Sequence, residues 1–475
     1  MSTNCNRFLP VFNRRDLLRS SANGFGMLAL ANLFQGEASA AGKAKAQGPL
    51  AERPPQYPAR AKRVIFLFMH GGPSQVDTFD PKPLLTRDSG KPFPGEKPRV
   101  QFAQTGNLLK SPWEFKKYGQ SGTEVSDLFP HVGRHVDDMC VIRSIHANNS
   151  AHGGALLQLH TGSDTFVRPS IGSWVNYGLG TENQNLPGFI TICPTLGHGG
   201  VQNWSSAFLP GDYQGTPIGN ASIRAREAKL KFIQNDEMDS QDQLSQLDYL
   251  KRMNERHLKP LAPDPLLEAR INSFELAYRM QSAAPAVMDI SGESAATLKM
   301  YGVGEEPTDN FGRQCLLARR FAESGVRFIQ CTHSYKWDQH GNLREGHTKN
   351  AREVDQPIAA LLTDLKERGL LEDTLVWWGG EFGRTPTAQG NDGRDHNPHA
   401  FSMWLAGGGV KPGITYGATD DYGYYAMENK VHMHDLHATI LHLLGMHHEK
   451  LTYRYAGRDF RLTDVAGRIV EDIVA

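Results

Sequence analysis

The chain has 475 residues, and its 51 Lys and Arg balance its 51 Asp and Glu, so the formal net charge is zero. This balance excludes the basic surplus expected of a nucleic-acid-binding protein and the polybasic run expected of one held on anionic lipid. Such a length allows a large buried core. The 48 glycines and 27 prolines indicate many loops, which is where functional side chains commonly lie.

The N-terminal segment has the three parts of an export signal. Paired arginines, Arg14 and Arg15, precede a short apolar run at 24–34 and an Ala-x-Ala cleavage site at 38–40. This order resembles a twin-arginine signal peptide covering residues 1–40; the alternative is a disordered basic tail. The interpretation predicts a periplasmic or secreted protein that engages the twin-arginine export machinery. No later segment is long and apolar enough for a permanent membrane anchor.

The mature chain is predicted to be one α/β domain. Residues 41–60 are rich in Ala, Lys, Gln and Pro, which favours a linker, and the domain at 61–475 opens with an apolar run at 64–69 typical of a buried parallel strand. Further strands are predicted at 140–142, 189–192, 326–329, 374–378 and 401–405, and helices at 311–324, 354–368 and 436–444. This alternation favours a three-layer sandwich around a mostly parallel sheet. Residues 221–300 are charged and poor in strands, and are predicted to be a helical insertion.

Polar residues gather where these strands end. In an open α/β sheet the site forms beyond the carboxyl ends of the strands. Each polar residue alone is more often a turn former or a helix cap, but imidazoles and carboxylates converging from several strands are what a divalent metal requires. We therefore expect one or two ions of Zn, Mn or Ca. The candidate ligands are His70, Asp77, Asp338, His340, Glu381 and His396.

Two further pairs of residues are candidates for catalysis and substrate binding. Ser150 and His152 follow a strand and open an apolar helix, where the helix N-terminus and a nearby metal would favour an alkoxide. Ser150 could instead only cap the helix, and His152 could be a ligand, an acid or a substrate contact. Arg384 is a candidate substrate contact, because guanidinium suits phosphate and sulfate, and His399 is a second candidate. The alternative for Arg384 is an ordinary surface arginine.

Several segments resemble a known superfamily. Residues 361–376 look like the sulfatase and phosphodiesterase segment before a Ser-Asp-His-Gly metal motif, and 380–383 stand in the place of that motif. His396 resembles the later metal-binding histidine, and 434–441 resemble the closing helix. With the paired arginines and the tail at 451–464, the chain is similar to an uncharacterised, twin-arginine-exported, sulfatase-like family of planctomycete type, a domain of unknown function within the alkaline phosphatase superfamily.

This resemblance implies an alkaline-phosphatase-like fold and a hydrolase acting on an anionic phosphate or sulfate ester, such as a sulfated or phosphorylated carbohydrate. Two positions depart from the pattern: His70 stands where the superfamily has Asp, and Phe382 replaces a metal-binding His. The Cys/Ser-x-Pro-x-Arg motif that yields formylglycine is also missing, so ordinary sulfatase chemistry is not expected. The alternative is a non-catalytic cell-envelope binding protein that retains the fold.

The cysteines carry little information about the site. Cys5 lies in the predicted signal, which leaves four cysteines in the mature chain. None of them forms a Cys-x-x-Cys pair, so a zinc ribbon or redox motif is not expected. Two disulfides could form after export, but the spacing leaves their pairing open.

Overall fold

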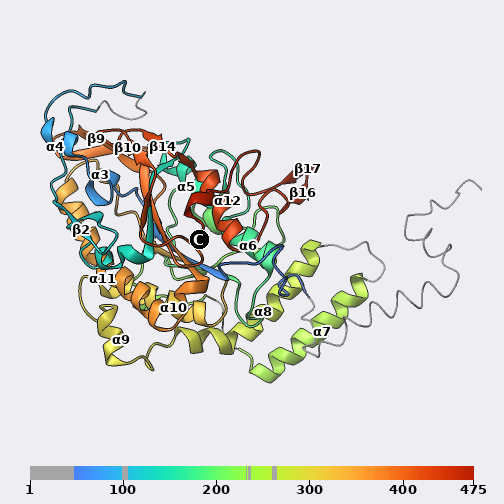
Figure 1. Cartoon of the computed structure of the whole chain (residues 1–475). Helices are drawn as coiled ribbons and strands as arrows, with labels where there is room; N and C mark the ends of the chain where they lie inside the picture. The colour runs from blue at the N-terminus through green and yellow to red at the C-terminus, as the bar shows by residue number, and fades with distance from the viewer. Residues whose placement is uncertain (1–47, 99–104, 232, 234–236, 259–264) are drawn as a thin grey trace, which may run out of the picture. The chain divides into compact units, whose positions relative to one another are not determined.

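The computed structural model describes residues 48–98, 105–231, 233, 237–258 and 265–475. The predicted signal peptide at 1–40 and the start of the predicted linker lie outside these residues. Figure 1 shows the chain as a ribbon coloured from blue to red along the sequence.

A nine-stranded sheet forms the centre of the described domain. The strand order is β12-β4-β11-β8-β1-β7-β5-β6, and β15 also pairs with β4. Strands β6, β5, β7, β1 and β8 run parallel, whereas β11 is antiparallel to both of its neighbours. The strands are β1 (Arg63–Met69), β4 (Met139–His146), β5 (Phe189–Ile192), β6 (Thr216–Ile218), β7 (Phe328–His333), β8 (Thr374–Gly379), β11 (Phe401–Ala406), β12 (Ile414–Tyr416) and β15 (Val431–His432).

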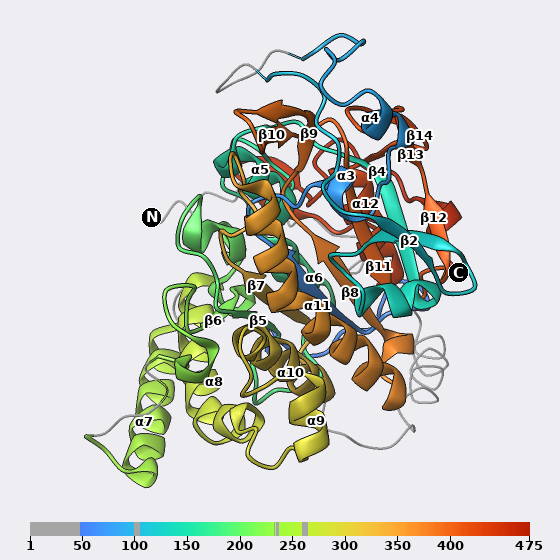
Figure 2. The ribbon, with the colours of Figure 1, turned by 90° about the vertical axis from the view of Figure 1, so that its left-hand side faces the viewer.

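Helices cover both faces of this sheet. The longer helices packed on it are α6 (Ile171–Leu179), α10 (Asp309–Glu323), α11 (Leu343–Glu367) and α12 (Met433–Leu443). Successive side chains of β1 point to opposite faces, so Phe66 packs into a core with α6 and α12, while Leu67 packs into a second core with α10 and α11. All seven residues of β1 are buried, as the unbroken apolar run predicts. The expected three-layer α/β sandwich is therefore confirmed (Figures 1 and 2).

The remaining elements lie outside the sheet. Two-stranded pairs are formed by β2 (Phe115–Tyr118) with β3 (Thr123–Ser126), β9 (Gly383–Gln389) with β10 (Gly393–Asn397), β13 (Ala418–Thr419) with β14 (Ala426–Glu428), and β16 (Tyr453–Tyr455) with β17 (Arg458–Phe460). The other helices are α3 (Gln75–Thr78), α4 (Pro83–Arg87), α5 (His152–Thr161), α7 (Ser240–Leu258), α8 (Pro265–Met288) and α9 (Ala295–Met300). Short 3-10 helices are η1 (Val132–Asp138), η2 (Gly200–Trp204), η3 (Gly211–Tyr213), η4 (Ala225–Glu227), η5 (Leu371–Asp373) and η6 (Glu471–Ile473).

Two segments outside the sheet bear on the sequence expectations. The described residues of 221–300 form helices α7, α8 and α9 and the 3-10 helix η4, and they contain no strand. Residues 48–60, expected to be linker, are instead fixed on the domain. The amide of Arg53 donates to the carbonyl of Leu179 at 2.8 Å, and that of Arg60 donates to the carbonyl of Leu443 at 2.8 Å.

The four described cysteines are buried free thiols, and no disulfide joins them. They lie in strands or helices of the core or directly after a strand: Cys140, Cys193, Cys315 and Cys331. Within the described part of the chain, no helix has the length and apolar character needed to cross a bilayer.

The parallel strands end at one edge of the sheet, and the following loops meet there. Gly71, directly beyond β1, has a φ of +116°, and a Cβ at this position would lie 2.7 Å from the backbone nitrogen of Asp338. Only glycine combines that backbone conformation with so close an approach. The loops after β1 and β7 are therefore brought side by side, and this is where the polar residues gather.

Candidate functional site

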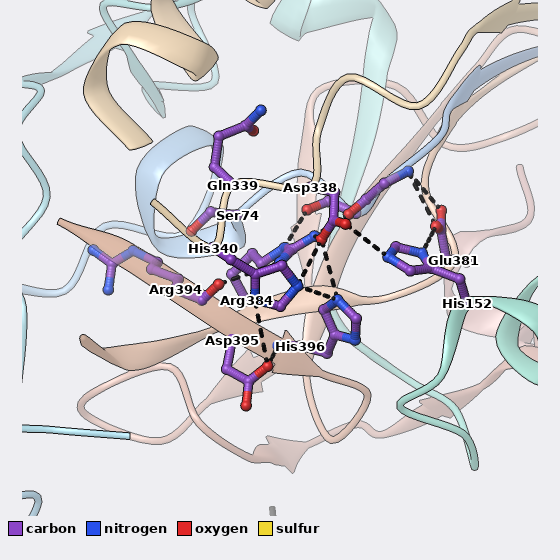
Figure 3. A network of polar contacts seen from close by, with 12 residues as sticks. Ser74, His152, Asp338, Gln339, His340, Glu381, Arg384, Arg394, Asp395 and His396 are labelled. Atoms are coloured by element: carbon purple, nitrogen blue, oxygen red, sulfur yellow. Dashed lines mark hydrogen bonds and ion pairs between the residues drawn. The ribbon is translucent and has the colours of Figure 1, made fainter. Parts of the chain in front are cut away.

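Asp338 lies at the centre of a cluster of imidazole and guanidinium groups (Figure 3). Its Oδ1 atom is 3.0 Å from Nε2 of His340, 3.1 Å from Nε2 of His396 and 2.6 Å from Nη2 of Arg384. Its Oδ2 atom is 3.3 Å from Nε2 of His152. The two nearest rings also face each other, with the Nε2 atoms of His340 and His396 3.0 Å apart. His340 from the same loop and three residues distant in sequence, His152, Arg384 and His396, thus direct polar atoms at one carboxylate.

The three imidazoles share a pattern on the opposite ring nitrogen. Each Nδ1 contacts an oxygen that can only accept, so each Nδ1 carries a proton and donates it. The acceptors are Glu381 Oε1 for His152 at 2.6 Å, the Ser150 carbonyl for His396 at 2.6 Å, and Gln389 Oε1 for His340. In a neutral ring the Nε2 atom then holds the lone pair, and all three Nε2 atoms point toward Asp338.

This arrangement suits a divalent cation. A carboxylate oxygen and the Nε2 atoms of His340 and His396 form a triangle with edges of 3.0, 3.0 and 3.1 Å. A proton on one ring satisfies one of these contacts, whereas an ion about 2.1 Å from each atom would satisfy all three. Metal-bound histidines commonly donate their other nitrogen to an oxygen in this way. Among the described residues, groups able to share an ion include His152, Asp338 and His396, and His340, Asp395 and His396.

His152 is held between two carboxylates. Burial alone lowers its pKa, but hydrogen bonds to Asp338 and Glu381 outweigh burial and raise the pKa of His152 to about 9. A ring in this position attracts positive charge to Nε2, either as a proton or as a metal cation. His152, a candidate from the sequence, thus lies in the cluster, and its three interpretations as ligand, acid or substrate contact stay open.

Glu381 reaches the cluster through His152. Its side chain is fully buried, and it accepts from the amide of Gly71 at 3.0 Å as well as from His152. Burial raises the pKa of Glu381, yet the hydrogen bond from His152 and the charge of His70 bring it below the usual value. Glu381 is absent from the groups of described residues that could share an ion. Within the described residues Glu381 therefore contacts the cluster through His152, whose ring it orients.

His70 faces the site as a hydrogen-bond donor. The amide of Tyr335 donates to its Nδ1 at 3.1 Å, so the proton of the neutral ring sits on Nε2. Burial lowers the pKa of His70 to about 4, although Glu381 raises it. Its Nε2 lies 4.0 Å from Glu381 Oε1 and has no hydrogen-bond partner among the described residues. His70 lies close enough to His152 and His198 to share an ion, but its proton suits it better to donate than to ligate.

His198 and Tyr335 belong to the site and were missed by the sequence reasoning. The His198 ring stacks on that of His152 at 4.9 Å and lies 5.0 Å from the ring of Tyr335. Both residues have a positive φ, 46° and 49°, a strained conformation that often marks functional loops. His198 follows β5 by six positions, so the rule applied to the other strand ends would also have found it.

The structure does not bring Asp77 to the cluster. Its two carboxylate oxygens lie 2.7 and 3.2 Å from the guanidinium nitrogens of Arg394, and both side chains are fully buried. This contact joins the loop after β1 to the β9–β10 hairpin. The expectation that Asp77 is a metal ligand is corrected accordingly: a buried arginine takes its charge.

The remaining candidates differ in burial and in their contacts. Arg384 is fully buried; its guanidinium donates to the backbone carbonyls of Gly71 and Gly72 and to Asp338, so it orders the loop and is not an ordinary surface arginine. The backbone carbonyl of Ser150 accepts a hydrogen bond from Nδ1 of His396. The N-cap residue of α5 is Ala151, not Ser150. His399 packs its ring 5.4 Å from that of Tyr425 and belongs to none of the ion-sharing groups found among the described residues.

Phe382 occupies the position expected of a histidine ligand. Its ring stacks on His396 with centroids 4.4 Å apart and lies 4.8 Å from the ring of His152. The side chain is buried. An aromatic side chain therefore stands where the resemblance predicts a metal-binding histidine, and it restricts rotation of the His152 and His396 rings.

Together, these features define an α/β protein with a histidine- and carboxylate-rich site at the carboxyl edge of a mostly parallel sheet. Residues 61–474 match the family described as "Protein of unknown function (DUF1501)", and the chain belongs to this family. A comparison with curated proteins gives no match.

Several solved structures are similar to the chain at low identity. A protein of the alkaline phosphatase superfamily from Vibrio parahaemolyticus is 10% identical, with a TM-score of 0.34 over 90% of this chain and 76% of that one. The PsFucS1 sulfatase from Pseudoalteromonas sp. is 12% identical, with a TM-score of 0.35 over 82% and 68%. The lipoteichoic acid synthase LtaP from Listeria monocytogenes is 9% identical, with a TM-score of 0.35 over 86% and 76%. These likenesses are too distant to assign an activity.

Proposed function

We propose that this protein is an exported, metal-dependent hydrolase of phosphate or sulfate esters that works without formylglycine. The observation that carries the proposal is the set of three imidazoles whose Nε2 atoms converge on Asp338 while each Nδ1 donates to an oxygen. His152, Asp338, His340 and His396 would hold the ion. When bound, a Zn, Mn or Ca ion would act as a Lewis acid toward the anionic ester and lower the pKa of a coordinated hydroxyl or water.

The chain's own residues supply orientation and polar contacts. Glu381 fixes the ring of His152, and Arg384 fixes Asp338, so these side chains enter the reaction already positioned. His70 directs an N–H group toward the same space. Ser150 stands two residues before helix α5, where the helix N-terminus favours an anion. Ser150 or a water molecule is the proposed nucleophile, and His399 stays a proposed substrate contact.

The substrate class follows from the same chemistry. The N–H group of His70 and a bound cation would favour a compact anionic group over a neutral one. One similar solved structure is described as a complex with k-i-k-neocarrahexaose. We include a sulfated or phosphorylated carbohydrate among the proposed substrates.

The decisive experiment measures metal content and turnover on the same preparation. Protein comprising residues 41–475 is purified without chelator, analysed by plasma mass spectrometry, and assayed with p-nitrophenyl phosphate and p-nitrophenyl sulfate. We expect one or two equivalents of metal and ester turnover that falls about a hundredfold or more in Asp338→Asn. Asp459→Asn, an exposed position, is the control. Metal-free protein that takes up no added ion would contradict the proposal.

A non-catalytic binding protein of the cell envelope is the second candidate. One observation in its favour is Phe382, which stands where a metal-binding histidine is expected. Another is Arg384, whose guanidinium already donates to four oxygen acceptors within the chain. Loss of turnover in Ser150→Ala with metal retained would favour the hydrolase. Ligand binding without turnover by any variant would favour the binding protein.

Export is a separate proposal. It depends on Arg14, Arg15, the apolar run and the Ala-x-Ala site. The twin-arginine route carries folded proteins, which fits a site assembled from distant segments. Arg14→Lys/Arg15→Lys should retain the protein in the cytoplasm, as seen by fractionation. Unchanged export of this variant would exclude the route.

A further inference from the structure

A groove beside helix α11 lies apart from the histidine cluster. Two adjoining cavities, of about 570 and 610 Å³, share the lining residues Pro307, Arg344, Thr348 and Arg352. The last three are spaced four residues apart on one helix, so they lie on one face, and the two arginines are separated by about 12 Å along the helix axis. The groove is therefore elongated in the direction of α11.

The two arginines on this face have no internal anion. Arg344 and Arg352 are exposed, and neither forms an ion pair or a side-chain hydrogen bond with another residue of the described chain. In contrast, Arg384 and Arg394 of the site are fully buried and engaged by acceptors. The exposed guanidinium groups can thus receive external sulfate or carboxylate groups, which they bind with two parallel hydrogen bonds.

Of the six carboxylates that line the two cavities, three have partners within the described chain (Asp355, Glu306 and Asp392) and three do not (Asp127, Glu305 and Glu345). Asp355 accepts from the backbone amides of His131 and Val132 at 2.9 and 2.8 Å, and Glu306 pairs with Arg224 at 2.5 Å. These acidic groups therefore do not neutralise the arginines. Their charges do, however, oppose a ligand that is densely anionic along its whole length.

The rest of the lining favours a sugar chain. Asp127, Glu305 and Trp113 line the first cavity. Carboxylates accept hydrogen bonds from hydroxyl groups, and the half-buried indole of Trp113 offers a flat apolar surface. A ligand with spaced anionic groups and many hydroxyls satisfies both kinds of lining. A nucleic acid carries a negative charge on every phosphate, so it can pair with the arginines but is repelled by the carboxylates.

The groove ends beside the candidate site. Asp392, in the turn of the β9–β10 hairpin, lines the second cavity and accepts from the amide of Asn342 at 3.0 Å. His340 stands two residues before Asn342, and its side chain is 35% exposed. In Figure 2 the upper end of α11 lies below this hairpin. We propose that the groove binds a linear sulfated polysaccharide whose end or branch reaches His340. That this polysaccharide is a substrate rests on the proposed function, whereas its binding to the groove does not.

The test compares oligosaccharides of two lengths. A fluorescent disaccharide and octasaccharide derived from κ-carrageenan, whose sulfates are widely spaced, are titrated with the mature protein, and binding is followed by anisotropy. We expect the octasaccharide to bind about tenfold tighter or more, and Arg344→Ala/Arg352→Ala to abolish this advantage. Added salt should weaken the longer ligand more. The matched control Arg252→Ala/Arg270→Ala removes two exposed arginines from α7 and α8 and should bind like wild type.

Equal affinity for both lengths, or an unchanged octasaccharide affinity in the Arg344→Ala/Arg352→Ala variant, would overturn the inference. So would equally tight binding of a desulfated octasaccharide or of an oligonucleotide with the same number of charges. Turnover of p-nitrophenyl esters by wild-type protein is measured in parallel. Length-dependent binding without turnover counts against the hydrolase alone, and turnover without length-dependent binding counts against the groove alone.

Discussion

Glu381 and His152, 229 positions apart in the chain, are joined by a hydrogen bond of 2.6 Å between Oε1 and Nδ1. The bond fixes which nitrogen of His152 faces Asp338. Outer contacts of this kind tune the affinity of a metal site without touching the ion. The ring is thereby tied to the strand end of β8.

We expect Glu381→Gln to weaken metal binding about 10- to 100-fold. The amide retains the size of the side chain but removes the charge that orients His152. The affinity is measured by competition with a chelating dye. Glu372→Gln, at an exposed position in η5, serves as the control, and an affinity equal to wild type in Glu381→Gln would show that the bond has no such role.

The buried pair of Asp77 and Arg394 should matter for stability. Removing one partner leaves an uncompensated charge in the protein interior, so Asp77→Asn should lower the free energy of unfolding by about 3–5 kcal/mol. The measurement is equilibrium unfolding in urea. Asp77→Leu/Arg394→Met should be less destabilised than either single change, because neither charge remains. If the double variant is the least stable, the pair has been misread.

Gly393 is expected to tolerate no side chain. A Cβ there would lie 1.9 Å from the carbonyl oxygen of His340, so Gly393→Ala must displace the loop that holds this proposed ligand. We predict reduced metal occupancy, with a smaller change in thermal stability than in metal content. Gly390→Ala is the comparison: nothing lies within 4 Å of its Cβ, although its φ of +61° adds backbone strain. Full occupancy in Gly393→Ala would contradict the close approach.

Acid should destabilise the fold through His437. Burial lowers the pKa of this histidine to about 3, below the value of about 6.5 expected when the chain unfolds. Between these two values the unfolded chain binds more protons than the folded chain, so stability falls as the pH is lowered from 6.5 toward 3. His437→Leu should remove up to about 1.4 kcal/mol per pH unit of this dependence.

The check is the urea unfolding free energy from pH 4.5 to 8. The difference in unfolding free energy between wild type and His437→Leu should be constant above pH 7, and it should shift in favour of His437→Leu as the pH is lowered. Curves that remain parallel throughout would mean that His437 does not sense acid.

Removing the metal should lower the melting temperature. An ion that binds only the folded chain stabilises it by about 4 kcal/mol when its free concentration is 1,000 times the dissociation constant. A chelator should therefore shift the melting curve of wild type, and readdition should reverse the shift. Asp338→Asn should show no such response, and a wild-type curve unaffected by chelator would argue against the site.

The fold could be predicted from the sequence further than the site. The apolar run of β1 and the alternation of strands and helices led directly to the layered sheet, because burial of apolar residues depends on local pattern. Asp338, His340 and His396 were predicted from the rule that loops after parallel strands meet, and they do meet.

Residue type alone could not assign the partner of each charged group. Asp77 was expected to face a metal and faces Arg394, because the sequence does not reveal which arginine folds over the loop. Glu381 was expected to be a metal ligand, and the structure shows it in a hydrogen bond with Nδ1 of His152. His198 and Tyr335 depend on positive φ values, which non-glycine residues adopt only when tertiary packing imposes them.

The side chains around Asp338 come from α5 and from β10, which is the last segment of the cluster in the chain. His396 of β10 contacts the carbonyl of Ser150, 246 positions earlier. A nascent chain still lacking the β9–β10 hairpin cannot complete the cluster. Capture of the proposed ion would therefore follow synthesis and folding, since metal binding and folding are coupled. In a protein exported after folding, the identity of the ion would be decided by the metals of the cytoplasm, not by those surrounding the finished protein.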